Sequence, residues 1–155
     1  MGADSQSAGE PRAEPRAPGV RFDTKVAVAV RNDLAVWQKL NVVAFLASGI
    51  GGSVNGIIGL PYEDADSTSY LPLCRQPITI LEGDAAGLAS SLRRALERKL
   101  RVAVYTEEMF VTSNDDDNRA VVRAVSSDRL NLVGVGVYGP RGAVDKALKN
   151  VHLHR

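Results

Sequence analysis

The chain has 155 residues, of which 45% are hydrophobic, and its 19 lysines and arginines nearly balance 18 acidic residues. This length suits one domain with a hydrophobic core, or a smaller domain with a tail. The near-neutral charge argues against a binder of nucleic acid or acidic lipid, because both usually carry a basic excess or stripe. No apolar run approaches the roughly 20 residues that span a bilayer, so no membrane association is expected.

The first 21 residues include the low-complexity string EPRAEPRAP and almost no large apolar side chain. Such a segment cannot bury enough surface to offset the entropy of ordering, so we predict a disordered tail over residues 1–21. It has no apolar stretch typical of a secretory signal. Residues 22–155 are predicted to form one domain. Cys74 is the only cysteine, so no internal disulfide can form, and these features together favour a cytoplasmic protein.

Apolar, β-branched runs predict four strands, and amphipathic segments predict four helices. The strands are expected over residues 25–30, 77–83, 101–105 and 130–139. The helices are expected over residues 33–48, 84–100, 113–127 and 140–151, and a long loop over 54–76. Because strands and helices alternate, we expect a layered α/β domain whose crossovers favour parallel strand pairing.

The ends of these helices carry recognisable signals. Asp33 or Asn32 is the expected cap of the first helix, which should end before Gly49. Asp84 is the expected cap of the second helix, and Ser113 or Asn114 that of the third. The last helix should begin with proline at its first position. The buried stripe of the first helix is expected to comprise Val36, Leu40, Val43 and Ala47, and that of the second Leu88, Leu92, Leu96 and Leu100.

Two long strings, KVAVAVRNDLAVWQKLNVVAFLASG and LVGVGVYGPRGAVDKALKNVHLH, resemble an uncharacterised bacterial family, the domain of unknown function two thousand. That family is identified as part of the peptidyl-tRNA hydrolase II superfamily, and the resemblance spans residues 23–154. It implies an α/β domain of the peptidyl-tRNA hydrolase II type, with a four-stranded mixed sheet flanked by helices on both faces.

The resemblance to the enzymes themselves covers the scaffold only. Their Arg-x-Asp-Leu after the first strand is matched by Arg31, Asp33 and Leu34, and their closing Gly-Pro helix by Gly139, Pro140, Val144, Asp145 and Lys146. Their Gly-Lys is not matched, because Lys39 precedes Leu40, and their Ala-Gln and His have no counterpart on the first helix. TEEMF replaces their Asp-Ala-Gly, with Glu107 or Glu108 nearest in place, and only Thr112 remains of a Thr-Gln pair. The resemblance therefore implies the fold without the usual catalytic set.

Trp37, Asn41 and Phe45 follow one another at helical spacing and share one side of the first helix. Two interpretations of this stripe have equal standing. One is core packing, with Asn41 bonded to nearby backbone. The other is the floor of a pocket, with an aromatic wall and an amide that orients a ligand. In either case the amide needs a polar partner, because an unpaired amide among apolar groups is destabilising.

The run YGPRG, which contains Tyr138, Gly139, Pro140 and Arg141, ends a strand and begins a helix. Ligands in α/β sheets collect beyond strand ends, and Arg141 could add a charge-assisted contact. A tight turn that leads into the helix is the favoured interpretation, because the run is not a phosphate-binding signature.

No metal or cofactor site is predicted. Asp115, Asp116 and Asp117 lack the spacing of a calcium loop and complement the dipole of a helix N-terminus. Cys74 has no nearby histidine, and two histidines, His152 and His154, do not make a metal site by themselves.

We therefore predict an uncharacterised cytoplasmic domain that binds a small molecule or peptide between the first helix and the YGPRG turn. The expected ligand-binding residues are Asp33, Trp37, Asn41, Tyr138, Gly139, Pro140 and Arg141. One alternative is a divergent hydrolase, with Lys39, Asn41 and Glu107 as weak catalytic candidates. A third hypothesis is a protein-interaction module or homodimer. Nucleic-acid binding is not expected, and it would depend on the basic run 93–101, which we interpret as a solvated helix face.

Overall fold

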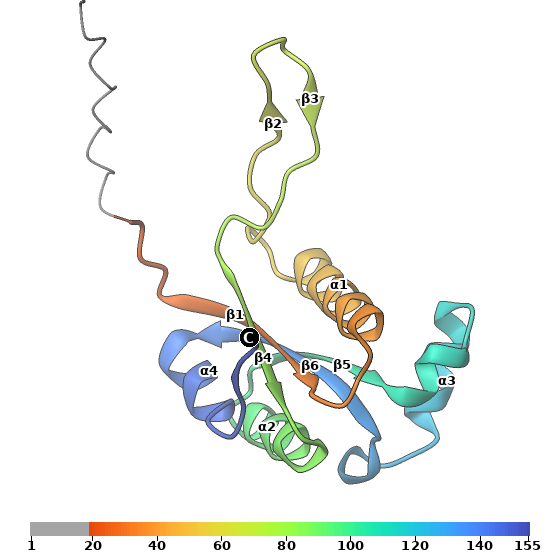
Figure 1. Cartoon of the computed structure of the whole chain (residues 1–155). Coiled ribbons are helices and arrows are strands. Elements are labelled where there is room, and N and C mark those ends of the chain that lie inside the picture. Colours follow the sequence, from red (N-terminus) through yellow and green to blue (C-terminus); the bar gives the residue numbers. More distant parts are fainter. Residues whose placement is uncertain (1–18) are drawn as a thin grey trace, which may run out of the picture.

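A five-stranded sheet with the strand order β5–β6–β1–β4–β7 organises the computed structural model, which describes residues 19–155 (Figure 1). Its strands are β1 (Thr24–Arg31), β4 (Ile78–Gly83), β5 (Arg101–Thr106), β6 (Leu132–Pro140) and β7 (His152–Leu153). The helices are α1 (Val36–Ser53), α2 (Ala85–Glu97), α3 (Asp115–Arg123) and α4 (Arg141–Ala147), with short 3-10 turns η1 (Glu107–Val111) and η2 (Ser127–Arg129). A separate hairpin pairs β2 (Tyr62–Glu63) with β3 (Ser69–Tyr70).

Most of the predicted tail, 1–21, lies outside the described residues. Residues 19–21 are exposed and belong to no helix or strand.

The four predicted strands are confirmed in position, but the sheet has five strands because β7 adds to the edge of β4. The expected parallel pairing is wrong for most of the sheet. Only β1 and β4 are parallel neighbours, whereas β6 runs antiparallel to both β1 and β5. The connections through α1 and α2 do preserve strand direction, as expected. The connection through α3 instead reverses the direction of the chain, so that β6 runs antiparallel to β5. Strand β6 then lies between β1 and β5.

Glycines in β6 bring α1 close to the sheet. Val135 and Val137 point to the face covered by α2 and α4, and the alternate positions Gly134 and Gly136 face α1. A Cβ at Gly134 would lie 2.3 Å from Val42 Cγ1 and 2.8 Å from Leu46 Cδ1. The absence of side chains at these positions therefore leaves the space that the buried side chains of α1 fill.

The buried stripe of α1 differs from the expected one. Val42, Leu46 and Ile50 are buried, whereas Val36 and Leu40 are 73% and 67% exposed. The helix is apolar on several sides, so helical spacing alone supports more than one stripe. The glycine-lined surface of β6 selects the stripe that is buried.

The ends of α1 also differ from the prediction. Ala35 is the residue before the helix, and its backbone N–H donates to the Gln38 side chain over 3.0 Å, so neither Asn32 nor Asp33 caps it. The helix continues through Gly49 and ends at Ser53. Burial of one face of α1 against the sheet offsets the poor helix propensity of its glycines.

The other helices are closer to expectation. Asp84 caps α2 by accepting from Gly87 N–H over 2.7 Å, and Asn114 caps α3 by accepting from Asp117 N–H over 2.9 Å. All three remaining helices end earlier than predicted, and Pro140 precedes α4 instead of occupying its first position. In α2, Leu88 and Leu92 are buried but Leu96 is half exposed.

Residues 55–75 form a narrow projection, here called the arm, that extends away from the sheet beyond the end of α1 (Figure 1). The predicted loop with short extended pieces is confirmed, and those pieces pair as β2 and β3. The backbone at its base is also paired, because Gly59 N–H donates to the Leu73 carbonyl and Arg75 N–H to the Ile57 carbonyl.

Candidate functional site

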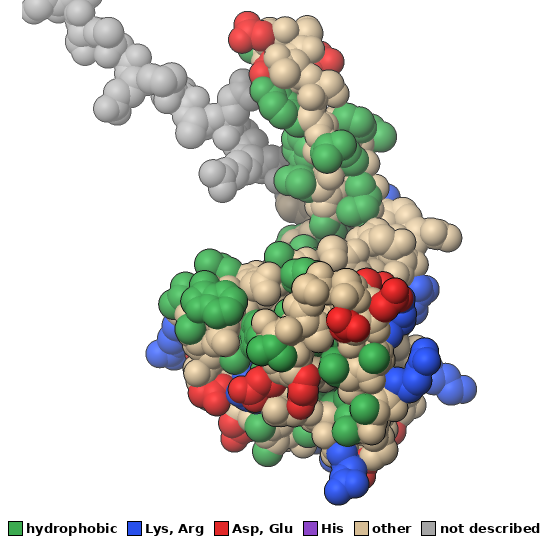
Figure 2. Space-filling view, turned by 90° about the vertical axis from the view of Figure 1, so that its right-hand side faces the viewer, with side chains coloured by type: hydrophobic (Ala, Val, Ile, Leu, Met, Phe, Trp, Pro, Cys, Tyr) green, Lys and Arg blue, Asp and Glu red, His purple; other side chains and the backbone are tan. Residues whose placement is uncertain are grey.

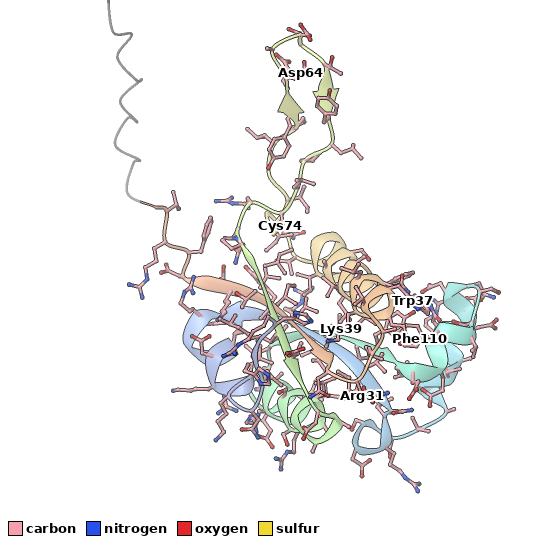
Figure 3. All side chains as sticks on the ribbon, viewed as in Figure 1. Arg31, Trp37, Lys39, Asp64, Cys74 and Phe110 are labelled. Carbon is pink, nitrogen blue, oxygen red and sulfur yellow. The ribbon has the colours of Figure 1, made fainter. Side chains whose placement is uncertain are left out.

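The first turns of α1 lie at the end of the sheet where β1, β4 and β5 all finish. These three strands point in one direction, and β6 begins at the same end of the sheet. The topology therefore gathers polar side chains that are far apart in the sequence around α1. Figure 3 shows Arg31, Trp37 and Lys39 grouped there, with Phe110 beside Trp37.

Arg31 is the centre of the first polar cluster. Its guanidinium donates to the Asp33 carboxylate over 2.6 Å, to Glu107 Oε2 over 3.3 Å and to Asn131 Oδ1 over 3.2 Å. Burial lowers the pKa of Arg31, but the hydrogen bonds and charges of Asp33 and Glu107 raise it above its ordinary value. Glu107 Oε2 also accepts from the Asn131 amide over 2.9 Å. This carboxylate is thus already engaged by two donors, an arrangement that favours a structural ion pair over a free general base.

Lys39 belongs to a second cluster, on the side of α1 that faces β4 and β7. Its Nζ lies 3.2 Å from Glu82 Oε2 and 3.2 Å from His154 Nε2. His152 Nε2 lies 3.7 Å from the other oxygen of Glu82. The hydrogen bond from Lys39 lowers the pKa of Glu82, and the charges of the histidines act in the same direction. Lys39 is therefore paired. Strand β7, which contains His152 and is followed by His154, was not among the strands predicted from the sequence.

The third feature is a hollow of about 320 Å³ between α1 and the η1–α3 segment. Trp37, Asn41 and Phe45 line it from α1, which agrees with the pocket interpretation of this stripe. Aromatic rings close the opposite wall. The ring centroids of Trp37 and Phe110 are 5.9 Å apart, and those of Phe45 and Tyr105 are 5.7 Å apart, both edge to face.

Tyr105 places a hydroxyl at this wall. It is only 5% exposed, and burial raises the pKa of its phenol, an effect that the nearby Asn41 amide opposes. The amide of Asn41 thus has a polar neighbour within the hollow. Sequence reasoning missed Tyr105 and Phe110, since strand and turn positions alone do not reveal which helix they face.

A second hollow, of about 450 Å³, continues the first along α1 and α3. The two share walls from α1, β5, η1 and α3, namely Phe45, Tyr105, Met109, Asp115 and Asn118. We call the combined depression the α1–α3 groove. Its far end is lined by Arg119 and Arg123. Arg119 pairs with Asp115 and Asp116 on its own helix, whereas Arg123 forms no ion pair within residues 19–155.

The expected cleft between α1 and the YGPRG turn does not form. Because β6 is antiparallel to β1, Tyr138 pairs with Val26 and Pro140 with Thr24, at the opposite end of β1 from Asp33. Tyr138 packs near the C-terminal end of α1, and the Arg141 side chain donates to the Phe22 carbonyl over 3.2 Å. Gly139 belongs to the same strand end, where a Cβ would meet Leu100 Cδ2 at 2.5 Å. The predicted ligand-binding residues therefore divide into two groups, which lie at opposite ends of the strands.

The weak catalytic candidates are also separated by their partners. Lys39 pairs with Glu82, Asn41 faces the α1–α3 groove, and Glu107 pairs with Arg31. No hydrogen bond or ion pair joins any two of the three within the described residues.

The remaining candidates take structural places. Asp115, Asp116 and Asp117 form the first turn of α3, and within residues 19–155 no three His, Cys, Asp or Glu side chains are grouped as metal ligands would be. Cys74 is partly buried at the base of the arm, in an isolated bridge with Ile58. In the basic run 93–101, Arg94 is an exception to the expected solvated face. It is 9% exposed and donates to the Ala147 carbonyl at the end of α4 over 2.9 Å.

None of the helices within residues 19–155 combines the length and hydropathy needed to cross a membrane. Among solved structures, a protein of unknown function from Agrobacterium tumefaciens strain C58 is 46% identical, and the match covers 87% of this chain and 100% of that protein, with a TM-score of 0.84. No curated protein matches the chain. The profile of a family described as "protein of unknown function (DUF2000)" matches residues 24–155. The chain therefore belongs to the DUF2000 family.

Proposed function

We propose that the chain binds a small molecule or short peptide in the α1–α3 groove. The observation that carries this proposal is the continuity of two hollows of about 320 and 450 Å³ along one wall of α1. Each has the size of an ordinary ligand pocket, which ranges over roughly 300–1,000 Å³. The YGPRG turn is not part of this proposal, because it lies at the opposite end of the strands.

The walls of the groove define the chemistry of the ligand. Trp37, Phe45 and Phe110 offer aromatic surface to an apolar group. Asn41 and Asn118 bring amides that both donate and accept hydrogen bonds. A ligand with an apolar body and an amide, hydroxyl or carboxylate group would satisfy both kinds of wall.

We extend the proposal to the ancestry of the fold. The positions of Arg31 at the end of β1 and of Asp33 and Leu34 just after it support a kinship with the peptidyl-tRNA hydrolase II superfamily. The single cysteine supports a cytoplasmic location. Binding without turnover is favoured over hydrolysis, because Lys39, Asn41 and Glu107 have separate partners. We expect the purified chain to leave peptidyl-tRNA intact. Turnover that Lys39→Ala or Asn41→Ala abolishes, without loss of folding, would contradict this.

Trp37 provides a direct test, since it is the only tryptophan in the chain, is 62% exposed and lines the groove. A library of small amides, aromatic acids and dipeptides would be screened by tryptophan fluorescence, and the hits confirmed by thermal shift. We expect at least one class to shift the emission of Trp37 and raise the melting temperature.

Matched asparagine variants make the test specific. Asn118→Ala removes an amide from the groove, whereas Asn150→Ala removes an exposed one beyond the end of α4. We expect Asn118→Ala to weaken a hit by about tenfold, equivalent to the roughly 1–1.5 kcal/mol of one hydrogen bond, and Asn150→Ala to leave it unchanged. Equal affinities in the two variants would place the ligand elsewhere, and the absence of any hit across the library would count against the proposal.

A further inference from the structure

The arm is an ordered element that contributes little to the core of its own chain. Its tip is held by Asp64, whose carboxylate accepts from the backbone N–H groups of Asp66 and Thr68 over 2.9 and 3.0 Å and from the Tyr70 hydroxyl over 2.8 Å. Its paired strands are only two residues long each. An isolated hairpin of this kind is at best marginally stable in water, so a packing partner would stabilise it.

Apolar side chains are exposed along the arm. Leu60 and Leu71 are each 85% exposed, and Leu73 is 63% exposed. Tyr62 and Tyr70, which are paired across the hairpin, are both 53% exposed. Figure 2 shows these hydrophobic groups along the projection, with acidic side chains at its end. Exposed apolar patches of this extent mark interaction sites.

A second exposed apolar surface lies on α1, on the side away from the α1–α3 groove. Val36 is 73% exposed and Leu40 is 67% exposed. Both border a hollow of about 210 Å³ between α1 and β4, whose remaining apolar lining comes from Val30, Val43 and Ile80. Lys39 and His154 stand at this hollow, and both are already paired with Glu82. We call this surface the α1–β4 hollow.

We propose that the arm of one chain docks into the α1–β4 hollow of a second copy, and that the same contact is made reciprocally in a two-fold dimer. A second copy fits best because each chain carries both halves of the contact, which allows a closed and self-complementary interface. The acidic residues of the arm are confined to its tip, at Glu63, Asp64 and Asp66. Lys39 is the only charged side chain of α1, and Glu82 already pairs with it, so the contact that we propose is apolar rather than an ion pair.

The exposed apolar area is comparable to that of a standard interface. Together with Val36 and Leu40, the five arm side chains expose on the order of 1,000 Å² per chain, against the about 800 Å² that each partner buries in a standard interface. Because the tip of the arm is already held in one conformation, docking loses less conformational entropy. This interface is separate from the α1–α3 groove, so the two proposals can fail independently.

The oligomeric state of the full chain tests the proposal, measured by sedimentation equilibrium over a range of concentrations. We expect the wild type to be a dimer. Leu71→Asp on the arm and Leu40→Asp at the hollow should each weaken association by at least a hundredfold, because each places a charge in an apolar contact. Val111→Asp is the matched control, since Val111 is 90% exposed on η1 and belongs to neither surface. Its dimer should persist. A monomeric wild type, or dimers of undiminished strength in both leucine variants, would overturn the proposal.

Cross-linking then tests which surfaces meet. In a Cys74→Ser background, a tagged Leu71→Cys chain is mixed with an untagged Leu40→Cys chain under mild oxidation. We expect a disulfide between the two different chains, and a much lower yield when Val111→Cys replaces Leu40→Cys. Equal yields for the two pairings would show that the arm does not dock in the α1–β4 hollow, even if the wild type is dimeric.

Discussion

The two faces of the sheet are covered in different ways. On one face, α2 and α4 cover a single cluster that includes Leu88, Leu92 and Val144, and most of the sheet side chains beneath them are buried. On the other face, α1 buries only one stripe of side chains. Apolar side chains on its two flanks stay exposed, one set at the α1–α3 groove and the other at the α1–β4 hollow. The first face supplies most of the buried core, and it retains one hollow of about 430 Å³ where Leu92 and Leu96 of α2 lie near Leu130 and Leu132. The second retains apolar surface that the chain itself does not bury, so we assign both binding proposals to it.

The largest expected effect separates these two roles. Leu88→Ala, on the closed face, should lower the free energy of unfolding by about 2–5 kcal/mol, because Leu88 is completely buried and its loss leaves a cavity. Leu40→Ala, on the open face, should change it by no more than about 0.5 kcal/mol. Urea unfolding followed by circular dichroism in dilute protein would measure both without a contribution from association. Similar losses in the two variants would mean that the open face is as closely packed as the other.

The next effect concerns how close α1 lies to the sheet. Gly134→Ala should be destabilising by about 1–3 kcal/mol, because its new methyl group would overlap Val42 and Leu46. Gly142→Ala is the matched control within α4, where nothing lies within 4 Å of the added carbon. It should stabilise the chain by up to about 1 kcal/mol, through better helix propensity. Thermal unfolding of the pair should thus give shifts of opposite sign, and shifts of the same sign would refute the close approach of α1.

The smallest expected effect is the pH dependence contributed by Glu82 at the edge of the open face. Its pKa is lowered in the folded chain, mainly by Lys39, so its contribution to stability is present above the ordinary glutamate pKa of about 4.3. That contribution is lost as the pH falls through the lowered value. Glu82→Gln should therefore make the melting temperature less sensitive to acid than in the wild type. Glu97→Gln, at an exposed position on α2, serves as the control and should retain the wild-type acid profile. An unchanged profile in Glu82→Gln would remove this ion pair from the account of stability.

Local sequence signals located most elements of the fold. Strands β1, β4, β5 and β6 were predicted where they occur, because their β-branched runs are bounded by charge or turn residues. Asp84 was identified as a cap because its side chain acts on the backbone only three residues away. The position of Trp37 and Asn41 on one side of α1 was also predicted, since helical spacing alone places them there.

The errors arose where a choice depended on contacts distant in sequence. The buried stripe of α1 was wrong because the helix is apolar on more than one side, and the glycines of β6 decided which side packs. The prediction of a cleft was wrong because it placed Tyr138 at the same end of the strands as Asp33. Antiparallel pairing reverses β6 and moves Tyr138 to the other end. Strand β7 consists of two residues, too short for any periodic pattern to reveal.

The sequence by itself determined the order and type of the main elements, the capping of α2 by Asp84, and the shared side of α1 that carries Trp37, Asn41 and Phe45. These depend on neighbours within one or two helical turns or along a single strand. Only the tertiary structure decided the direction of β6, the face of α1 that packs, and the pairing of Lys39 with Glu82 and of Arg31 with Glu107. The physical reason is that strand order and helix rotation are set by the summed packing of segments more than a hundred residues apart, and no local spacing records that sum.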